Sequence, residues 1–130
     1  MSHWTAQDTS NMTDQEYQAY SLQGVSRTFA LTIPQLPEAL RLPVGNAYLL
    51  CRITDTIEDE ASLAMAQKET RAAEFVDVVK GTHSAEEFAA AFSADLTANT
   101  PEAERDLIRN TARVIRLTHR FTAPQRRAIG

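Results

Sequence analysis

The sequence predicts an all-α fold, and three observations support this class. Helix-start signals recur along the 130 residues: a Ser or Thr followed three residues later by Glu or Gln, or a Thr directly before a Pro. Apolar residues recur at helical spacing, most clearly over residues 38–62. No segment resembles part of a strand-rich domain. With 43% hydrophobic residues, the chain can form one domain with a modest core.

The first predicted helix follows a polar leader. Residues 1–12 show no periodicity, so we expect a loose leader in front of a domain that occupies residues 13–130. Thr13 and Glu16 match a capping box, in which each side chain bonds the other residue's backbone N–H. The helix they open should run for about ten residues, until Gly24 breaks it.

The second predicted helix covers residues 38–62, after a turn bracketed by two prolines. Pro43 lies within this span. Proline inside a helix removes a backbone hydrogen bond and costs about 3 kcal/mol or more. The pattern therefore leaves two alternatives open: a kink at Pro43, or a short helix followed by a main helix that starts near Leu42.

The middle of the chain is predicted to form two more helices. A valine-rich helix should end at Gly81, since glycine tolerates the left-handed conformation that stops helices. Ser84 and Glu87 then repeat the capping-box signature. The short helix that follows carries two aromatic residues four apart, which we expect to pack in the core: Phe88 and Phe92.

The last part of the chain carries two further helix starts. Thr100 and Pro101 are typical of an N-cap and a first helical residue, and the helix should continue to about His119. Three acids in its first turns have a sufficient explanation in the helix dipole: Glu102, Glu104 and Asp106. Thr122 with Gln125 announces another helix just before residue 130, so we expect the sequence to be cut.

The most informative stretch runs from Tyr48 to Glu60, reading YLLCRITDTIEDE. At about 100° per residue, four of its polar side chains fall within an arc of about 60° on one face, opposite the apolar residues: Tyr48, Arg52, Asp55 and Asp59. Acids four residues apart repel each other, and Glu58 and Glu60 add negative charge that a single arginine cannot neutralise. Oxygen ligands about one helical turn apart suit magnesium, which keeps much of its shell for water and substrate phosphates. A solvated acidic patch explains the charges equally well.

A second polar group precedes this helix in the segment SRTFAL. Ser26 and Arg27 follow Gly24 closely and could donate hydrogen bonds to an anion such as diphosphate. The residues alone favour a simpler role for Ser26, as the N-cap of a helix.

Composition excludes several classes of function. A net charge of −4 gives no electrostatic footprint for a nucleic acid partner. The single Cys51 excludes an internal disulfide, and the three histidines lack zinc-like spacing. No apolar run approaches the ~18 residues of a membrane span, and no signal pattern is present at the N-terminus. We therefore expect a cytoplasmic protein, with peripheral membrane contact left open.

Together, SRTFALTIPQLPEALR and AYLLCRITDTIEDE resemble the opening of the squalene/phytoene synthase family, which joins two prenyl diphosphates head to head. The resemblance implies the N-terminal part of an all-helical isoprenoid synthase bundle. It assigns Asp55, Glu58 and Asp59 to the first aspartate-rich motif, which holds Mg²⁺ against the substrate diphosphate. It places the remaining matched residues beside that diphosphate, with catalytic roles for the last two: Ser26, Arg27, Phe29, Tyr48 and Arg52. As an alternative, Tyr48 could be a buried tyrosine bonded to a backbone carbonyl.

The resemblance also implies a reaction. The glutamate of DTIED and the SRTFA segment look more like the squalene type, in which two farnesyl diphosphates give squalene through presqualene diphosphate and NADPH is the expected reductant. Phytoene or dehydrosqualene synthesis is the alternative within the family, and a non-catalytic helical interaction module is the alternative outside it. A second aspartate-rich motif is absent from these 130 residues, so we expect an N-terminal fragment that is inactive alone. Oligomeric state and prenyl chain length are not indicated.

Overall fold

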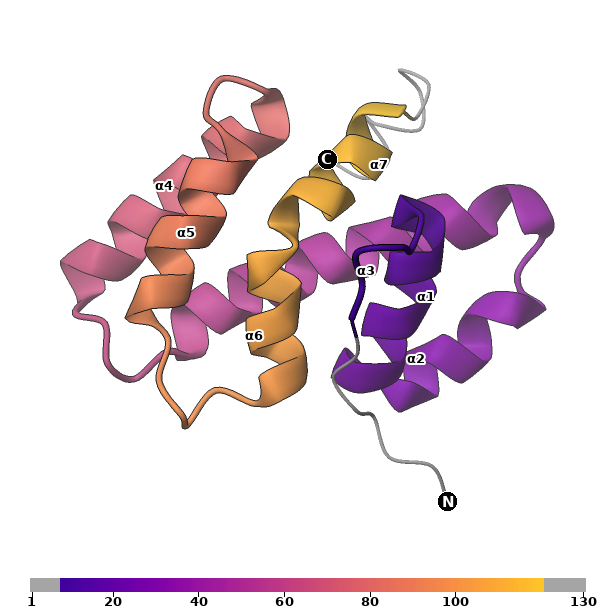
Figure 1. Ribbon diagram of the computed structural model, residues 1–130, viewed down its shortest axis with the longest axis horizontal. Coiled ribbons are helices and arrows are strands. Elements are labelled where there is room, and N and C mark those ends of the chain that lie inside the picture. The colour runs from indigo at the N-terminus through magenta and orange to yellow at the C-terminus, as the bar shows by residue number, and fades with distance from the viewer. Residues whose placement is uncertain (1–7, 121–130) are drawn as a thin grey trace.

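The computed structural model describes residues 8–120 as a bundle of helices, and no strand occurs in this range (Figure 1). The all-α prediction is confirmed. The elements, in chain order, are α1 (Asp14–Val25), α2 (Arg27–Thr32), the short 3₁₀ helix η1 (Ile33–Gln35), α3 (Glu38–Asp59), α4 (Met65–Lys80), α5 (Ala85–Asp95), α6 (Glu102–Arg109) and α7 (Thr111–Arg120).

Helix α3 is the centre of the bundle and contacts α1, α4, α6 and α7. In Figure 1 it passes behind α6 and α7, with α4 and α5 at one end and α1 and α2 at the other. Its inner face carries Leu49, Ile53 and Ile57, which are at most 1% exposed. These residues are four apart, so they lie on one stripe of the helix and join the core as the periodicity predicts. Burying each of them is worth about 1.5–3 kcal/mol.

Pro43 does not divide α3. The helix runs without a break from Glu38 to Asp59, which excludes the alternative of a separate main helix starting near Leu42. The predicted end near residue 62 is also wrong, because the helix ends at Asp59. Close packing against α1 supports the helix near the proline, because Gln18 Nε2 donates to the carbonyl of Leu42 at 3.1 Å. Gly45 permits this approach: a Cβ there would lie 2.6 Å from Gln18 Oε1.

Helix α1 begins with the predicted capping box. Glu16 N donates to Thr13 Oγ1 and Thr13 N donates to Glu16 Oε1, which confirms the helix start. The helix continues to Val25, one residue beyond the Gly24 expected to break it, and Ser26 follows as its C-cap.

Tyr17 fastens α1 to the last two helices. Its side chain is completely buried, and its hydroxyl donates to Asp106 Oδ2 at 2.7 Å. The guanidinium of Arg113 lies 5.2 Å from the centre of the Tyr17 ring, within cation–π range. Burial, reinforced by the charge of Asp106, raises the pKa of Tyr17 well above its ordinary value.

Arg113 also holds the chain in front of α1. Its guanidinium donates to the carbonyl oxygens of Thr9, at 2.7 Å, and Met12, at 3.3 Å. The described end of the expected leader, residues 8–12, is therefore anchored to α7. Residues 1–7 lie outside the described part of the chain.

Helices α4 and α5 are the two predicted helices, and they pack against each other. Gly81 ends α4 with φ of 87°, a backbone conformation that residues other than glycine rarely adopt. Ser84 Oγ accepts from the N–H of Glu87 and caps α5. The aromatic residues of α5 are fully buried core residues, as expected: Phe88 and Phe92.

The predicted helix over residues 101–119 is in fact two helices. It breaks at Asn110, whose side-chain amide donates to the carbonyl of Asp106 and so competes with the backbone ladder. Thr100 is not the N-cap: Pro101 holds that position, and the Thr100 hydroxyl bonds Glu60 instead. The helix start predicted at Thr122 and Gln125 lies outside the described residues.

No helix within residues 8–120 combines the length and the apolar character needed to cross a membrane.

Candidate functional site

The acids of the DTIED motif lie on the exposed side of the last turns of α3. The side chain of Asp55 is 52% exposed, and Glu58 and Asp59 are also exposed. Asp59 is the final residue of the helix, so these carboxylates lie near its C-terminal end. The helix dipole is negative there and does not stabilise their charge. The predicted separation of a core face from a charged face is therefore present in the structure.

Arg52 is paired more closely with α6 than with the acidic motif. Its Nη2 lies 2.7 Å from Glu104 Oε1, whereas its Nη1 lies 4.0 Å from Asp55 Oδ2. Glu104 is buried, with 8% of its surface exposed. The helix dipole was the reason inferred from the sequence for the acids at the start of α6, and that interpretation missed this contact. One signal in the sequence could have indicated that Glu104 is buried: it lies among apolar residues of α6 that are themselves buried, Ala103, Leu107 and Ile108.

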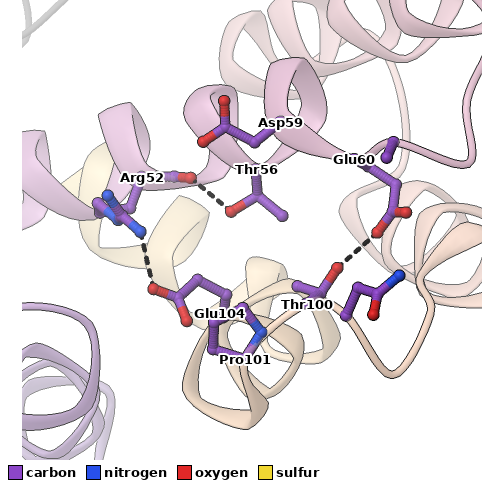
Figure 2. Close-up of a pocket in the computed structure, with 9 residues that line it drawn as sticks. Arg52, Thr56, Asp59, Glu60, Thr100, Pro101 and Glu104 are labelled. Carbon is purple, nitrogen blue, oxygen red and sulfur yellow. Dashed lines mark hydrogen bonds and ion pairs between the residues drawn. The ribbon is translucent and has the colours of Figure 1, made fainter.

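A cavity of about 220 Å³ lies between the end of α3 and the start of α6 (Figure 2). Arg52 and Glu104 meet on one side of it, and Glu60 and Thr100 meet on another. Figure 2 shows the carboxylate of Asp59 directed away from these two pairs. The cavity is lined mainly by polar side chains: Arg52, Thr56, Asp59, Glu60, Ala61, Asn99, Thr100, Pro101 and Glu104.

Glu60 joins the end of α3 to the loop before α6. Its buried carboxylate accepts from the Thr100 hydroxyl, from the N–H of Ser62 at 3.1 Å and from the Thr97 hydroxyl at 3.4 Å. Burial by itself would raise the pKa of Glu60, but these hydrogen bonds outweigh it and hold the pKa below its ordinary value. Glu60 is therefore a structural carboxylate, distinct from the exposed acids of the motif.

Replacing Thr100 with valine should expose this linkage as a pH-dependent loss of stability. A hydrogen bond to a charged group contributes about 1.5–3 kcal/mol, so the variant should unfold about that much more easily at pH 7. A carboxyl group with a lowered pKa stabilises the fold above its unfolded pKa of about 4.3, and this stabilisation disappears as the pH falls through the folded value. The difference between the two proteins should therefore shrink below about pH 4.3, as measured by urea unfolding.

Thr70→Val provides the control for this measurement. The Thr70 hydroxyl donates only to a carbonyl of its own helix, so the free energy of unfolding lost on its removal should be the same at pH 7 as below about pH 4.3. A pH-independent cost for Thr100→Val would contradict the assignment to Glu60.

The SRTF segment packs directly against α3. The ring of Phe29 stacks on that of Tyr48 with centroids 4.3 Å apart and an interplanar angle of 16°. Ser26 Oγ accepts from the N–H of Phe29 and caps α2, which is the simpler role considered for it. Arg27 is exposed, and its side chain has no bonding partner within residues 8–120. Tyr48 is partly buried and stacked, not bonded to a described backbone carbonyl as in the alternative interpretation.

A second hollow, of about 490 Å³, lies on the other side of the acidic face, between α3 and α4. Apolar residues such as Leu50, Phe75 and Val79 line it, and Asp55 stands among them with Lys80. Asp55 therefore borders an apolar groove, while Asp59 borders the polar cavity beside α6. The predicted site residues of α3 therefore share one helix but border two different hollows: Arg52 and Asp59 border the polar cavity, and Asp55 borders the apolar groove.

Magnesium fits the exposed carboxylates of α3 only as an open site. Within residues 8–120, no three His, Cys, Asp or Glu side chains form a group that could enclose a metal ion. Mg²⁺ is commonly held by one or two carboxylates, with water and substrate phosphates completing the shell. Asp55 and Asp59, one turn apart and exposed, offer such a partial ligand set.

Fold and site together define an all-α protein whose central helix presents acids and an arginine beside an aromatic pair. The family model for squalene/phytoene synthase matches residues 22–128, and the chain belongs to this family. A segment of 42 residues is 52% identical to a squalene synthase of Botryococcus braunii, covering 32% of this chain and 9% of that protein. A segment of the same length is 55% identical to a squalene synthase of Solanum lycopersicum, covering 32% and 10%.

A longer match joins this chain to a probable squalene synthase of Neurospora crassa. It is 35% identical over 74 residues, which is 56% of this chain and 15% of that protein. The chain thus matches only a small part of the length of these relatives. No solved structure matches it.

Proposed function

We propose that the protein carrying this chain joins two farnesyl diphosphates head to head, through presqualene diphosphate, to squalene. Membership of the squalene/phytoene synthase family and the names of the relatives support this reaction class. The observation that carries the proposal is the exposed face of α3, where Asp55, Asp59 and Arg52 lie along one side of a rigid helix. Acids and an arginine together suit a diphosphate that arrives with a divalent cation.

In this proposal the acids of α3 hold Mg²⁺ and the arginines contact the diphosphate. Asp55 and Asp59 would bind the ion, with Glu58 beside them, and the bound ion would stabilise the negative charge of the departing diphosphate. Arg27 is exposed and unpaired among the described residues, so its donors are available to the same anion. Fixed donors aimed at developing charge are a major source of rate enhancement in enzymes.

The aromatic pair next to these groups suits the positive charge left on the prenyl chain. When diphosphate leaves, an allylic cation remains, and the face of an aromatic ring attracts a cation. Tyr48 is held in place by its stack on Phe29, one turn before Arg52. The capping bond of Ser26 fixes the start of α2 and thereby the position of Phe29. We therefore assign Ser26 and Phe29 to positioning, and Tyr48 and Arg52 to contact with substrate.

Product analysis tests the reaction directly. The full-length protein, incubated with labelled farnesyl diphosphate, Mg²⁺ and NADPH, should give labelled squalene in the extracted lipids. Without NADPH, presqualene diphosphate or dehydrosqualene should accumulate from the same substrate. In a separate incubation with a labelled C20 prenyl diphosphate, formation of phytoene would favour the phytoene type. Recovery of only unreacted or hydrolysed substrate would contradict the proposed enzyme activity and favour a non-catalytic helical module.

A further inference from the structure

We propose that Glu104 is a positioning residue that fixes the guanidinium of Arg52 for contact with the substrate diphosphate. This inference rests on the proposed function, since it assigns a diphosphate to Arg52. Glu104 lies on a different helix from the acidic motif and 45 or more residues further along the chain, so its role depends on the packing of α6 against α3.

The geometry makes Glu104 the fixed member of the pair. Its side chain is 10% exposed, while that of Arg52 is 28% exposed. Glu104 stands in the first turn of α6, where the positive end of the helix stabilises a carboxylate. The longer and more flexible Arg52 reaches it with Nη2 at 2.7 Å. An arginine side chain carries about 2 kcal/mol of rotamer entropy, and this contact removes part of that freedom before substrate arrives.

The same contact leaves other donors of Arg52 available. A guanidinium has five N–H groups. Nη1 lies 4.0 Å from the nearest oxygen of Asp55, too far for a hydrogen bond. Nε is buried and has no partner among the described residues, so the donors left for a ligand are those of Nη1. Nη2 is thus held by Glu104, and the Nη1 donors remain for an anion beside Asp55.

Charge alone predicts the opposite effect for Glu104. A carboxylate near a bound diphosphate repels it, so removing the charge should strengthen diphosphate binding if position did not matter. If Glu104 positions Arg52, removing the charge should weaken binding. The direction of the change therefore separates the two roles.

The test compares two charge-neutralising variants of the same helix, Glu104→Gln and Glu102→Gln, in the full-length protein. Glu102 is the matched control because its carboxylate pairs with Arg105 and Arg109 and not with Arg52. Binding of inorganic pyrophosphate with Mg²⁺ is measured by calorimetry. We expect affinity to fall about 10-fold for Glu104→Gln, the size typical of lost outer-shell contacts, and to change less than about twofold for Glu102→Gln.

A further variant excludes a merely structural effect. In the Arg52→Gln background, which removes the charge that Glu104 holds, Glu104→Gln should cause no additional loss of pyrophosphate affinity if it acts through Arg52. A loss that persists there would overturn the inference, as would equal or tighter binding by Glu104→Gln alone. If the unchanged full-length protein does not bind magnesium pyrophosphate at all, the proposed function of this face fails, and the inference fails with it.

A measurement on the unchanged chain keeps the proposal testable even if the variants fold poorly. The ¹⁵N relaxation of the Arg52 Nε–H group should show restricted motion without ligand, while that of the exposed Arg27 should show free motion. Equal mobility of the two side chains would overturn the positioning role.

Discussion

Replacing both Asp55 and Asp59 with asparagine should nearly abolish turnover of prenyl diphosphate by the full-length protein while leaving the fold intact. Loss of groups that stabilise developing charge typically costs about 10²–10³ in rate, and here the pair is proposed to hold the metal. The stability of the 130-residue chain should stay unchanged or rise slightly. The substitution removes a like-charge repulsion of about 0.2–0.5 kcal/mol near a helix C-terminus. Product formation and the melting temperature measure the two effects.

The matched control is Glu69→Gln with Asp77→Asn, two exposed acids of α4. These two acids lie eight residues apart on one helix, and their substitution changes the net charge by the same amount as the Asp55 and Asp59 variant. Because they are surface sites away from the proposed chemistry, turnover should stay within about twofold of that of the unchanged protein. A melting temperature that falls by several degrees in the Asp55 and Asp59 variant would show that the acids are structural.

The largest loss of stability is expected for Tyr17→Ala. Truncating a buried aromatic residue costs about 3–5 kcal/mol, against a total of about 5–15 kcal/mol for a typical domain. The variant also leaves the buried carboxylate of Asp106 without its hydroxyl donor. Urea unfolding followed by circular dichroism measures the change, and Gln15→Ala on the exposed side of the same helix should stay within about 0.5 kcal/mol of the unchanged chain.

Tyr17→Phe separates the hydroxyl from the ring. This variant keeps the ring and its contact with Arg113, so it should lose only about 1–3 kcal/mol. Because the pKa of Tyr17 is raised in the fold, its contribution is complete below the unfolded pKa of about 10 and declines as the pH rises above it. If Phe and Ala cost the same, the ring does not contribute and the packing of α1 has been misjudged.

Local sequence signals predicted the helices well where the deciding contacts are themselves local. Thr13 with Glu16, Ser84 with Glu87, and Gly81 each act within one turn of the chain, and each lies where the sequence placed it. One error arose where a distant residue intervened. Thr100 has the sequence of an N-cap, but its hydroxyl bonds Glu60, 40 residues away. Periodicity over residues 101–119 continues through Asn110, so it could not reveal the break that this side chain introduces.

The candidate site shows the same division between local and distant information. The helical spacing of Tyr48, Arg52, Asp55 and Asp59 predicted a shared face, because four residues are about one turn. The pairing of Arg52 with Glu104 depends on how α6 packs against α3, and no spacing within either helix determines that. The sequence also could not show that Asp55 and Asp59 border separate hollows on the two sides of the face.

The bonds of Tyr17 and Arg113 determine when this domain can fold during synthesis. Tyr17 bonds a residue 89 positions later, and Arg113 bonds carbonyls more than 100 positions earlier. A ribosome adding 5–20 residues per second takes roughly 5–20 s to make the intervening chain. During that interval α1 has no α6 or α7 to cover it, and the ring of Tyr17 stays open to solvent. The nascent chain therefore leaves Tyr17 uncovered until residues 106–113 have left the ribosome, and closure of this bundle follows the synthesis of α6 and α7.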